Sequence, residues 1–461
     1  MVGGGLAGLA SAAALGERGL RVELFETSRR LGGRAGSFRD AVSGELLDCC
    51  QHVAMGCCTN LADFLRRTGT SDCFRRHCRM HFIGPDGKQY AFSATPLLPA
   101  PLHLVPGLMR LGYLSLAERL RILRTMARLA KLPAEPGNAT IGVWLRRQGE
   151  PDRAIERFWS VVLTSALSET VSRASLAAAR KVFVDGFLAS RRAYQLEVPQ
   201  VSLEEIFDRR VAESLTQRGV SLHRGIRIEK IDGDAHRARA VVLSDGSRRE
   251  FDFFVVAVPW RAVGAMFPPA MREGLPSLAD VGRIEPAPIT AVHLWFDRPI
   301  TLLPHAALVG RLGQWIFNHQ SSIINDPSHY YQVVISASHE LVGRDPEGVK
   351  DRVREELDEI WPVTRRAHLL RFRVITHPAA VFSVRPGVDR FRPPQQTPIG
   401  NLALAGDWTS TGWPATMEGA VRSGHLAAEV ILNQVFPGEA NRVLVADLAR
   451  GPLARRMIRD G

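Results

Sequence analysis

The first predicted element is a helix built from small apolar residues. Residues 6–18 are almost entirely Ala, Leu, Gly and Ser, which suits a helix that packs closely on a sheet, and Gly19 can end it. Residues 20–26 follow with the pattern of a strand. A helix followed by a strand is half of a βαβ unit, and this predicts an α/β fold with a parallel sheet.

The pattern becomes helical between about residues 95 and 192. Residues 115–132 repeat apolar side chains at helical spacing with Arg and Lys between them, and residues 157–169 and 175–189 have a similar character. This block predicts a helical cap with an apolar interior.

Strand patterns return after residue 220. Short apolar runs joined by Asp-Gly turns cover residues 221–258, and a mixed segment covers residues 271–391. Residues 400–432 indicate a strand, a glycine-rich turn and a helix. The tail beyond Pro437 is basic and weakly amphipathic, so we expect either a docking segment or a frayed end.

Length and composition restrict the fold. A chain of 461 residues with 45% hydrophobic and 23% charged residues is globular, and it is too long for a single ordinary core. No apolar run reaches the roughly 18 residues of a membrane-spanning helix. The glycine loop occupies the place of a secretory signal, so we expect a cytoplasmic protein.

Charge and cysteine spacing bear on partners. The net charge of +12 is spread over Arg-rich helices, so we expect no nucleic-acid partner, while peripheral contact with the inner face of a membrane stays an open alternative. Cys49-Cys50 and Cys57-Cys58 are adjacent pairs without C-x-x-C spacing. We therefore expect reduced thiols and no metal site.

The first chemical motif is a G-x-G-x-x-G loop at residues 3–8. Such a loop lets backbone N–H groups and a helix N-terminus approach a pyrophosphate, although it also occurs by chance. Glu26 ends the next strand, where a carboxylate can bind a ribose hydroxyl; a solvent-facing Glu is the alternative. Only Met1 and Val2 precede the loop. We therefore expect further β-branched residues upstream in the natural chain, and weaker folding and cofactor binding without them.

A second glycine doublet follows the predicted strand. Gly32-Gly33 permits another close backbone approach, and Arg34 supplies a guanidinium for phosphate, although an ordinary turn would also explain the doublet. A domain that binds NAD alone has no need of this doublet, so its position after Glu26 indicates FAD.

These motifs, with the "LALAGDWTSTGWPATMEGAVRSG" segment at residues 402–424, resemble the FAD-dependent superfamily of amine oxidases and phytoene-type desaturases. The resemblance implies that Asp407 contacts the ribityl-phosphate part of FAD. It also implies that the helix beginning near Thr416 directs its N-terminus at the flavin pyrimidine ring, where it stabilises negative charge. The backbone of Ile228 is assigned to the adenine, although a core position explains it equally well. The expected cofactor residues are Gly3, Gly5, Leu6, Ala7, Gly8, Glu26, Gly32, Gly33, Arg34, Ile228, Gly406, Asp407, Thr416, Met417 and Ala420.

Within the superfamily the chain resembles the squalene-associated branch, the hydroxysqualene dehydroxylases of hopanoid biosynthesis. The resemblance rests on residues 46–57, 158–175, 195–207 and 405–424. Cys49-Cys50 stands where we expect an Asn-Gly pair in that branch, and a side chain in place of that Gly can crowd the flavin.

The resemblance implies two discontinuous domains. A Rossmann-like FAD-binding domain of the two-dinucleotide-binding-fold type is expected from residues 1–94, 195–270 and 392–436. A substrate-binding domain with a mixed sheet and the helical cap is expected from residues 95–194 and 271–391, followed by a basic tail at 437–461.

The implied reaction replaces the allylic hydroxyl of hydroxysqualene, a hydrophobic isoprenoid, with hydrogen to give squalene. It requires a hydride from reduced flavin, an acid for the leaving hydroxyl and a dry apolar pocket, and the electron donor stays open. The candidate acids are His52, then Glu418, then Asp48. A structural role is the alternative for His52, and the helix dipole alone would explain Glu418.

Three other functions stay open. A carotenoid or phytoene-type desaturase would use the flavin oxidatively on a similar polyene. An amine oxidase is less favoured, because Trp408 and Trp413 alone do not establish an aromatic cage. A non-catalytic lipid-binding member would keep the fold and lose the flavin.

Overall fold

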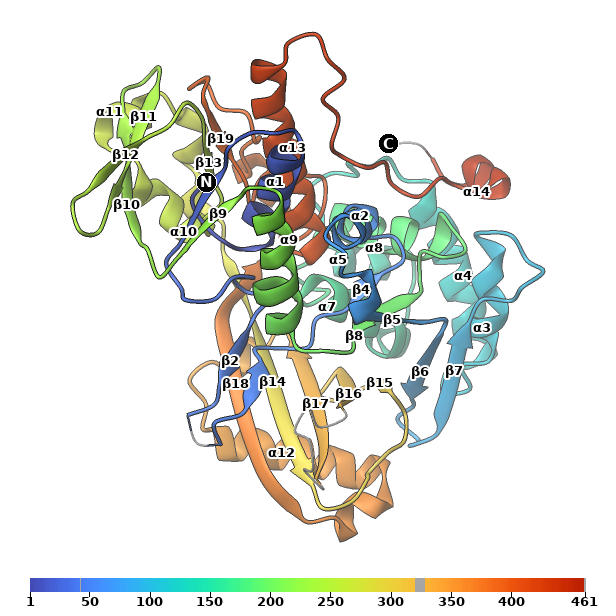
Figure 1. Ribbon diagram of the computed structural model, residues 1–461. Helices are drawn as coiled ribbons and strands as arrows, with labels where there is room; N and C mark the ends of the chain where they lie inside the picture. The colour runs from blue at the N-terminus through green and yellow to red at the C-terminus, as the bar shows by residue number, and fades with distance from the viewer. Residues whose placement is uncertain (42, 320–327, 460–461) are drawn as a thin grey trace.

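The computed structural model describes residues 1–461 except 42, 320–327 and 460–461 (Figure 1). Its parallel sheet is assembled from segments that lie far apart in the sequence. Strand β1 (Glu23–Glu26) pairs with β9 (Ser221–Arg224), and β13 (Phe254–Val256) pairs with β19 (Leu402–Leu404). Val2 lies between the two pairs and forms parallel bridges to Phe25 and Val256.

The short N-terminal segment therefore occupies the centre of the sheet. The Val2 N–H donates to the Val255 carbonyl at 2.9 Å, and the Gly3 N–H donates to the Phe25 carbonyl at 2.8 Å. These bonds carry the chain straight from the sheet into the glycine loop. The expectation of further upstream residues stays a prediction.

Helix α1 (Leu6–Glu17) packs against the long helix α13 (Met417–Val435), as Figure 1 shows. Its residues from Leu6 to Gly16 are all buried, which explains why they are small. A Cβ on Gly424 of α13 would lie 2.2 Å from the Ala7 carbonyl oxygen, so the two helices meet backbone to backbone. Gly19 ends the helix with φ +79°, as predicted, and the predicted strand starts at Glu23 rather than at residue 20.

A second, seven-stranded sheet forms the lower part of Figure 1, in the order β18-β14-β17-β16-β15-β6-β7. All neighbours are antiparallel except β15 and β6. Helix α12 (Pro346–Ile360) packs its buried face on this sheet through Val349, Val353 and Leu357. The strands are β6 (Arg79–Ile83), β7 (Gln89–Ser93), β14 (Pro286–Phe296), β15 (His305–Leu308), β16 (Trp315–His319), β17 (His329–Ser336) and β18 (Leu369–Phe382).

The sheet to which strands β6 and β7 belong differs from the predicted domain division. They lie within residues 1–94, which the sequence assigns to the FAD-binding domain, yet they extend the edge of the second sheet through β15. The reason is non-local pairing, which no pattern inside residues 79–93 reveals.

Smaller elements complete the two lobes. The three-stranded antiparallel sheet β10–β12 lies beside the parallel sheet, and two further small sheets have the strand orders β2-β3 and β4-β8-β5. The remaining strands are β2 (Ser37–Arg39), β3 (Leu46–Asp48), β4 (Ala54–Met55), β5 (Phe74–His77), β8 (Leu196–Pro199), β10 (Ile228–Gly233), β11 (Ala238–Leu243) and β12 (Arg248–Glu250). Helices outside the cap are α2 (Thr59–Arg67), α9 (Val211–Gln217), α10 (Trp260–Val263) and α11 (Pro269–Glu273).

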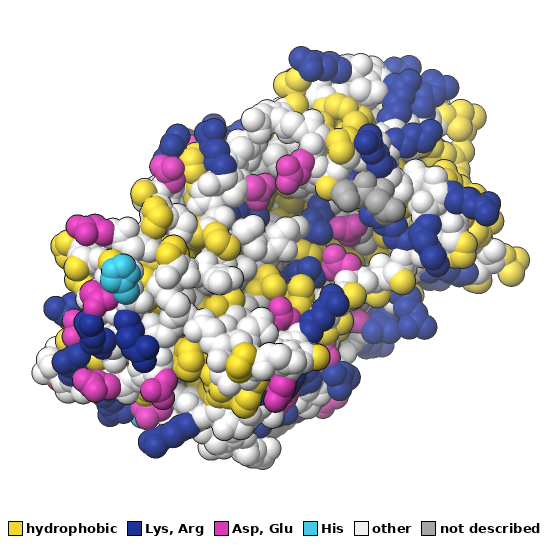
Figure 2. Space-filling view, turned by 90° about the horizontal axis from the view of Figure 1, so that it is seen from above, with side chains coloured by type: hydrophobic (Ala, Val, Ile, Leu, Met, Phe, Trp, Pro, Cys, Tyr) yellow, Lys and Arg dark blue, Asp and Glu magenta, His cyan; other side chains and the backbone are white. Residues whose placement is uncertain are grey.

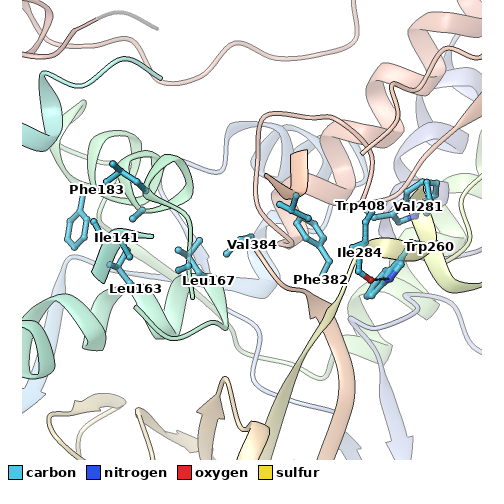
Figure 3. Packing of buried hydrophobic residues seen from close by; sticks show 14 of the residues in the cluster. Ile141, Leu163, Leu167, Phe183, Trp260, Val281, Ile284, Phe382, Val384 and Trp408 are labelled. Atoms are coloured by element: carbon cyan, nitrogen blue, oxygen red, sulfur yellow. Dashed lines mark hydrogen bonds between the residues drawn. The ribbon is translucent and has the colours of Figure 1, made fainter. Parts of the chain in front are cut away.

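The predicted helical cap is present, and its buried residues belong to a core that also includes Val2, Phe25 and Val256 of the parallel sheet. Figure 3 shows Leu163, Leu167 and Phe183 of the cap, with Val384 and Phe382 leading from them toward the parallel sheet. The cap helices are α3 (Val105–Met109), α4 (Leu116–Ala130), α5 (Ile141–Arg147), α6 (Asp152–Ala154), α7 (Val161–Leu167) and α8 (Leu176–Phe183).

The C-terminal tail is docked and not frayed. The Asn60 amide exchanges hydrogen bonds with the Val445 backbone at 2.9 and 3.0 Å. Helix α14 (Pro452–Met457) then places Ala454 and Ile458 in a buried cluster with Val184 of the cap. Among the helices in the described part of the chain, none has the length and apolarity needed to cross a membrane.

Candidate functional site

The glycine loop forms a cradle at the N-terminus of α1. A Cβ on Gly3, which has φ +104°, would lie 2.5 Å from the Ala257 carbonyl oxygen, and one on Gly8 would lie 2.0 Å from the Gly3 carbonyl oxygen. A Cβ on Gly5 would meet nothing within 4 Å. Gly3 and Gly8 therefore serve the fold, whereas Gly5 faces open space where no side chain caps α1.

Glu26 stands beside this cradle at the end of β1. Its Oε2 accepts from the Gly4 N–H at 2.7 Å, and its Oε1 accepts from the Ser28 N–H at 2.7 Å. These bonds fix the carboxylate at the cavity wall while each oxygen keeps a lone pair. That position is compatible with the predicted ribose contact.

The second glycine doublet packs against the first loop. The Gly32 N–H donates to the Gly4 carbonyl at 2.9 Å, and a Cβ on Gly33, which has φ +60°, would lie 3.1 Å from the Gly5 Cα. Arg34 follows, and its guanidinium forms an ion pair of 2.5 Å with Asp407 from the other end of the chain. The two glycine motifs and the Asp407 turn therefore meet at one place.

A buried arginine that the sequence analysis missed holds the Asp407 turn. Arg392 donates to the carbonyls of Asp407, Thr409 and Trp413 at 3.1, 2.7 and 2.8 Å. Gly406 opens this turn with φ +139°, and a Cβ there would collide with the Trp408 ring. Basic residues are common just before motifs rich in turn residues, so the sequence alone does not identify Arg392 as a residue of the site.

Helix α13 begins at this turn. The Thr416 hydroxyl accepts from the Gly419 N–H at 3.0 Å and caps the helix, and Met417 and Ala420 line the same cavity. Ile228, the first residue of β10, lines the same cavity from the sheet that lies beside the parallel sheet. Of the predicted cofactor residues, the structure brings all but Gly8 to this cavity.

The cavity continues from the cradle into the helical cap, and its volume is about 900 Å³. Its cap portion is apolar, with aromatic and aliphatic side chains from several helices. An ion pair, Lys181 with Asp185, interrupts this apolar wall. The apolar side chains that the cap contributes include Leu104, Leu108, Leu123, Met126, Phe158, Val161, Val162, Phe183 and Phe187.

His52 lines the cavity, but its hydrogen bond favours the role of a base over the predicted role of an acid. Its Nδ1 lies 2.9 Å from the Cys50 carbonyl, which only accepts, so Nδ1 carries the proton and neutral Nε2 carries a lone pair. Burial lowers the pKa of His52, and Arg34 lowers it further. A neutral ring is therefore favoured, and the acid role stays a prediction that these contacts do not support.

Glu418 is fully buried and caps helix α2. Its carboxylate accepts from the backbone N–H groups of Asn60 and Leu61 at 3.1 and 2.7 Å, and Arg422 lies 3.5 Å away. Burial raises the pKa of Glu418, while the N–H donors oppose this shift. These contacts explain a Glu at this position without catalysis, so its acid role also stays a prediction.

Asp48 does not belong to the cavity lining. Its Oδ1 accepts from the Ser37 hydroxyl at 2.6 Å and from the Leu203 N–H at 3.0 Å. Burial raises the pKa of Asp48 to about 6. The nearby Cys50 does line the cavity, and burial raises the pKa of its thiol to about 12. Its thiol is therefore a neutral part of the wall. It stands at the position where we expect Gly in the squalene-associated branch. All six cysteines are free, and no cluster suited to a metal occurs in the described part of the chain.

Comparison with known proteins agrees with this geometry. Residues 6–432 match the family of flavin containing amine oxidoreductases. The chain is 26% identical to the 15-cis-phytoene desaturase of Solanum lycopersicum over 456 residues, covering 94% of this chain and 77% of that one. It is 24% identical to the zeta-carotene desaturase of Synechocystis sp. over 477 residues, covering 94% and 96%.

Solved structures show the same fold. The cyclohexylamine oxidase of Brevibacterium oxydans superposes with a TM-score of 0.68 at 18% identity, covering 94% of this chain and 98% of that one. The predicted α/β FAD-binding fold is confirmed, and the cofactor is FAD. The open space at Gly5, the Glu26 carboxylate and the end of α13 fit the pyrophosphate, the ribose and the flavin ring respectively.

Gly5→Ala is expected to weaken FAD binding at least tenfold and leave the fold intact. Its Cβ enters the space that the pyrophosphate needs but meets no protein atom within 4 Å. FAD titration of the apoprotein by fluorescence quenching measures the dissociation constant, and thermal unfolding of the apoprotein tests the fold. Gly8→Ala is the matched control, because its Cβ strikes the Gly3 carbonyl and should destabilise the apoprotein itself. Wild-type FAD affinity in the Gly5→Ala variant would contradict the assignment.

Asp48→Asn is expected to stabilise the protein above pH 6 more than at pH 4. Because the folded-state pKa of Asp48 is raised to about 6, the wild type loses stability as the pH rises from about 4 to 6, and an amide has no such loss. Thermal unfolding at several pH values measures the difference. Asp245→Asn is the control of opposite sign, because hydrogen bonds from Ser247 lower the pKa of Asp245. A difference that does not change with pH would refute the expectation for Asp48.

Proposed function

Because the chain belongs to the family of flavin containing amine oxidoreductases, we propose that it reductively removes the allylic hydroxyl of hydroxysqualene and forms squalene. The observation that carries the proposal is the single cavity that runs from the FAD cradle into an apolar cap. Such a wall suits a long isoprenoid chain, whose burial releases water from apolar surface.

The reaction consumes two electrons and two protons. The carbon–oxygen bond breaks, the hydroxyl leaves as water after taking a proton, and hydrogen replaces it on the same carbon. Reduced FAD supplies the hydride. The cap excludes water that would otherwise trap an allylic cation, and aromatic faces such as those of Phe158 and Phe187 can stabilise that cation.

Carotenoid desaturation is the second candidate, and the two curated relatives favour it. Both are named as desaturases of carotenoid substrates and align with 94% of this chain. The same apolar cavity would accept a polyene, and the flavin would then be reduced rather than oxidised. The difference between the two functions lies in the direction of electron flow and in the oxygen of the substrate.

The FAD-loaded protein, reduced with dithionite without oxygen, is expected to convert hydroxysqualene to squalene and regain oxidised-flavin absorbance in equal amounts. Mass spectrometry measures the product, and flavin absorbance counts the electrons. In a parallel experiment, the oxidised enzyme is incubated with phytoene. Desaturation of phytoene without any squalene from hydroxysqualene would replace the first candidate by the second.

We also propose that the cap contacts an anionic membrane, from which the substrate enters. Leu97 is 92% exposed and Leu120 is 54% exposed, and α4 also presents Arg121, Arg124 and Arg128. Figure 2 shows basic and hydrophobic side chains gathered at the right-hand end of the molecule. Exposed leucines beside arginines suit insertion among acidic headgroups.

Leu97→Glu combined with Leu120→Glu is expected to reduce co-sedimentation with phosphatidylglycerol vesicles at least threefold. Both changes place carboxylates where acyl chains and acidic headgroups would lie. Leu302→Glu is the control, because Leu302 is 86% exposed and lies in the seven-stranded-sheet lobe. Equal loss in the control, or no binding by the wild type, would exclude this surface.

A further inference from the structure

The ion pair of Lys181 and Asp185 lies in the apolar wall of the cap. Lys181 Nζ donates to Asp185 Oδ2 at 2.8 Å, and both residues line the cavity. Their side chains are only 23% and 26% exposed. Removing charges from water is costly even when they are paired, so the pair requires an explanation beyond helix stability.

A local change of helix type places Asp185 on the cavity wall. Helix α8 ends at Phe183 and continues as a π-helical turn, η4 (Val184–Leu188), in which the Ala189 N–H donates to the Val184 carbonyl at 2.7 Å. Such turns occur often at functional sites because they redirect side chains. Arg180 of α8 is buried and donates to the Leu132 and Arg459 carbonyls, which holds the helix in place.

The pair faces the end of the cavity where the flavin ring is expected. Lys181 Nζ lies 4.6 Å from the centre of the Trp413 ring, and Trp413 precedes the N-terminus of α13 by a few residues. The buried Trp413 Nε1 has no hydrogen-bond partner in the described structure. Polar groups therefore gather where the apolar cap meets the cofactor end.

Other polar groups of the cap wall are less available to a ligand. The Ser165 hydroxyl donates to the Val161 carbonyl at 2.7 Å and accepts from Trp315 Nε1 at 2.9 Å. The other charged residues of the lining come from elements outside the cap; they are Glu26, Arg34, Arg227, Glu229, Asp407 and Glu418. Lys181 and Asp185 thus supply the cap with a donor and an acceptor side by side.

We propose that Lys181 and Asp185 form a polar anchor that recognises the hydroxyl of an oxygenated isoprenoid substrate. The hydroxyl would accept from Lys181 Nζ and donate to the Asp185 carboxylate, and both charges would stay hydrogen-bonded after water leaves. A pure hydrocarbon would desolvate the pair without replacing any hydrogen bond, so it binds less well. The inference rests on the proposed function, to which it adds the residues that choose an alcohol over a polyene.

The test compares hydroxysqualene with squalene, which lacks the hydroxyl, as ligands of the FAD-loaded protein. The change in flavin absorbance on titration gives each dissociation constant without turnover. The wild type is expected to bind the alcohol at least tenfold more tightly. Lys181→Met combined with Asp185→Leu should abolish that preference by weakening the alcohol without weakening squalene, while Lys181→Arg should keep part of the preference.

Lys350→Met is the matched control, because Lys350 pairs with Glu347 and Asp351 on α12, far from the cavity lining. Flavin absorbance and thermal unfolding verify that each variant is folded. Equal affinity of the wild type for both ligands, or equal loss of both affinities in the double variant, would overturn the anchor. A protein that prefers the alcohol yet forms no squalene would refute the proposed reaction and support the anchor.

Discussion

The close approach of backbone to backbone around α1 is the constraint on which the rest of the structure depends. Gly8 touches the Gly3 carbonyl, and Gly424 of α13 touches the Ala7 carbonyl, both at distances that no Cβ could occupy. Because α1 is thereby held against the glycine loop and α13, the N-termini of both helices open into one cavity. One packing solution thus positions two partial positive charges that lie some 400 residues apart in sequence, as an anionic cofactor requires.

The same constraint explains which parts of the site could be predicted from sequence. Gly3, Gly8, Gly32, Gly33 and Gly406 are required by positive φ angles or by close backbone approach, so their spacing is visible in the sequence. Arg392 acts by donating to carbonyls that are distant in sequence. The ion pair of Lys181 and Asp185 lies where α8 continues as a π-helical turn. No short motif encodes such contacts, because each depends on the finished fold.

Glu418 shows why residue type and position alone mislead about catalysis. A Glu in the first turn of a helix beside the flavin site has the right chemistry for an acid. In the structure its carboxylate instead meets the backbone N–H groups of Asn60 and Leu61 and joins α13 to α2. The sequence predicts the helix that begins near Thr416, but its contact with α2 comes from the tertiary packing, and only that contact reveals the capping role.

Burial drives the candidate acids of the site toward neutral forms. It lowers the pKa of His52 and raises the pKa values of Glu418 and Asp48, in each case as the largest cause. An apolar cap suits hydride transfer to an apolar chain, because it excludes water from the reacting carbon. Lys181 and Asp185 carry opposite charges and are hydrogen-bonded to each other, so the pair can hydrogen-bond a substrate hydroxyl without adding net charge to the cap wall. Recognition of an alcohol by this pair is therefore compatible with hydride transfer inside an apolar cap.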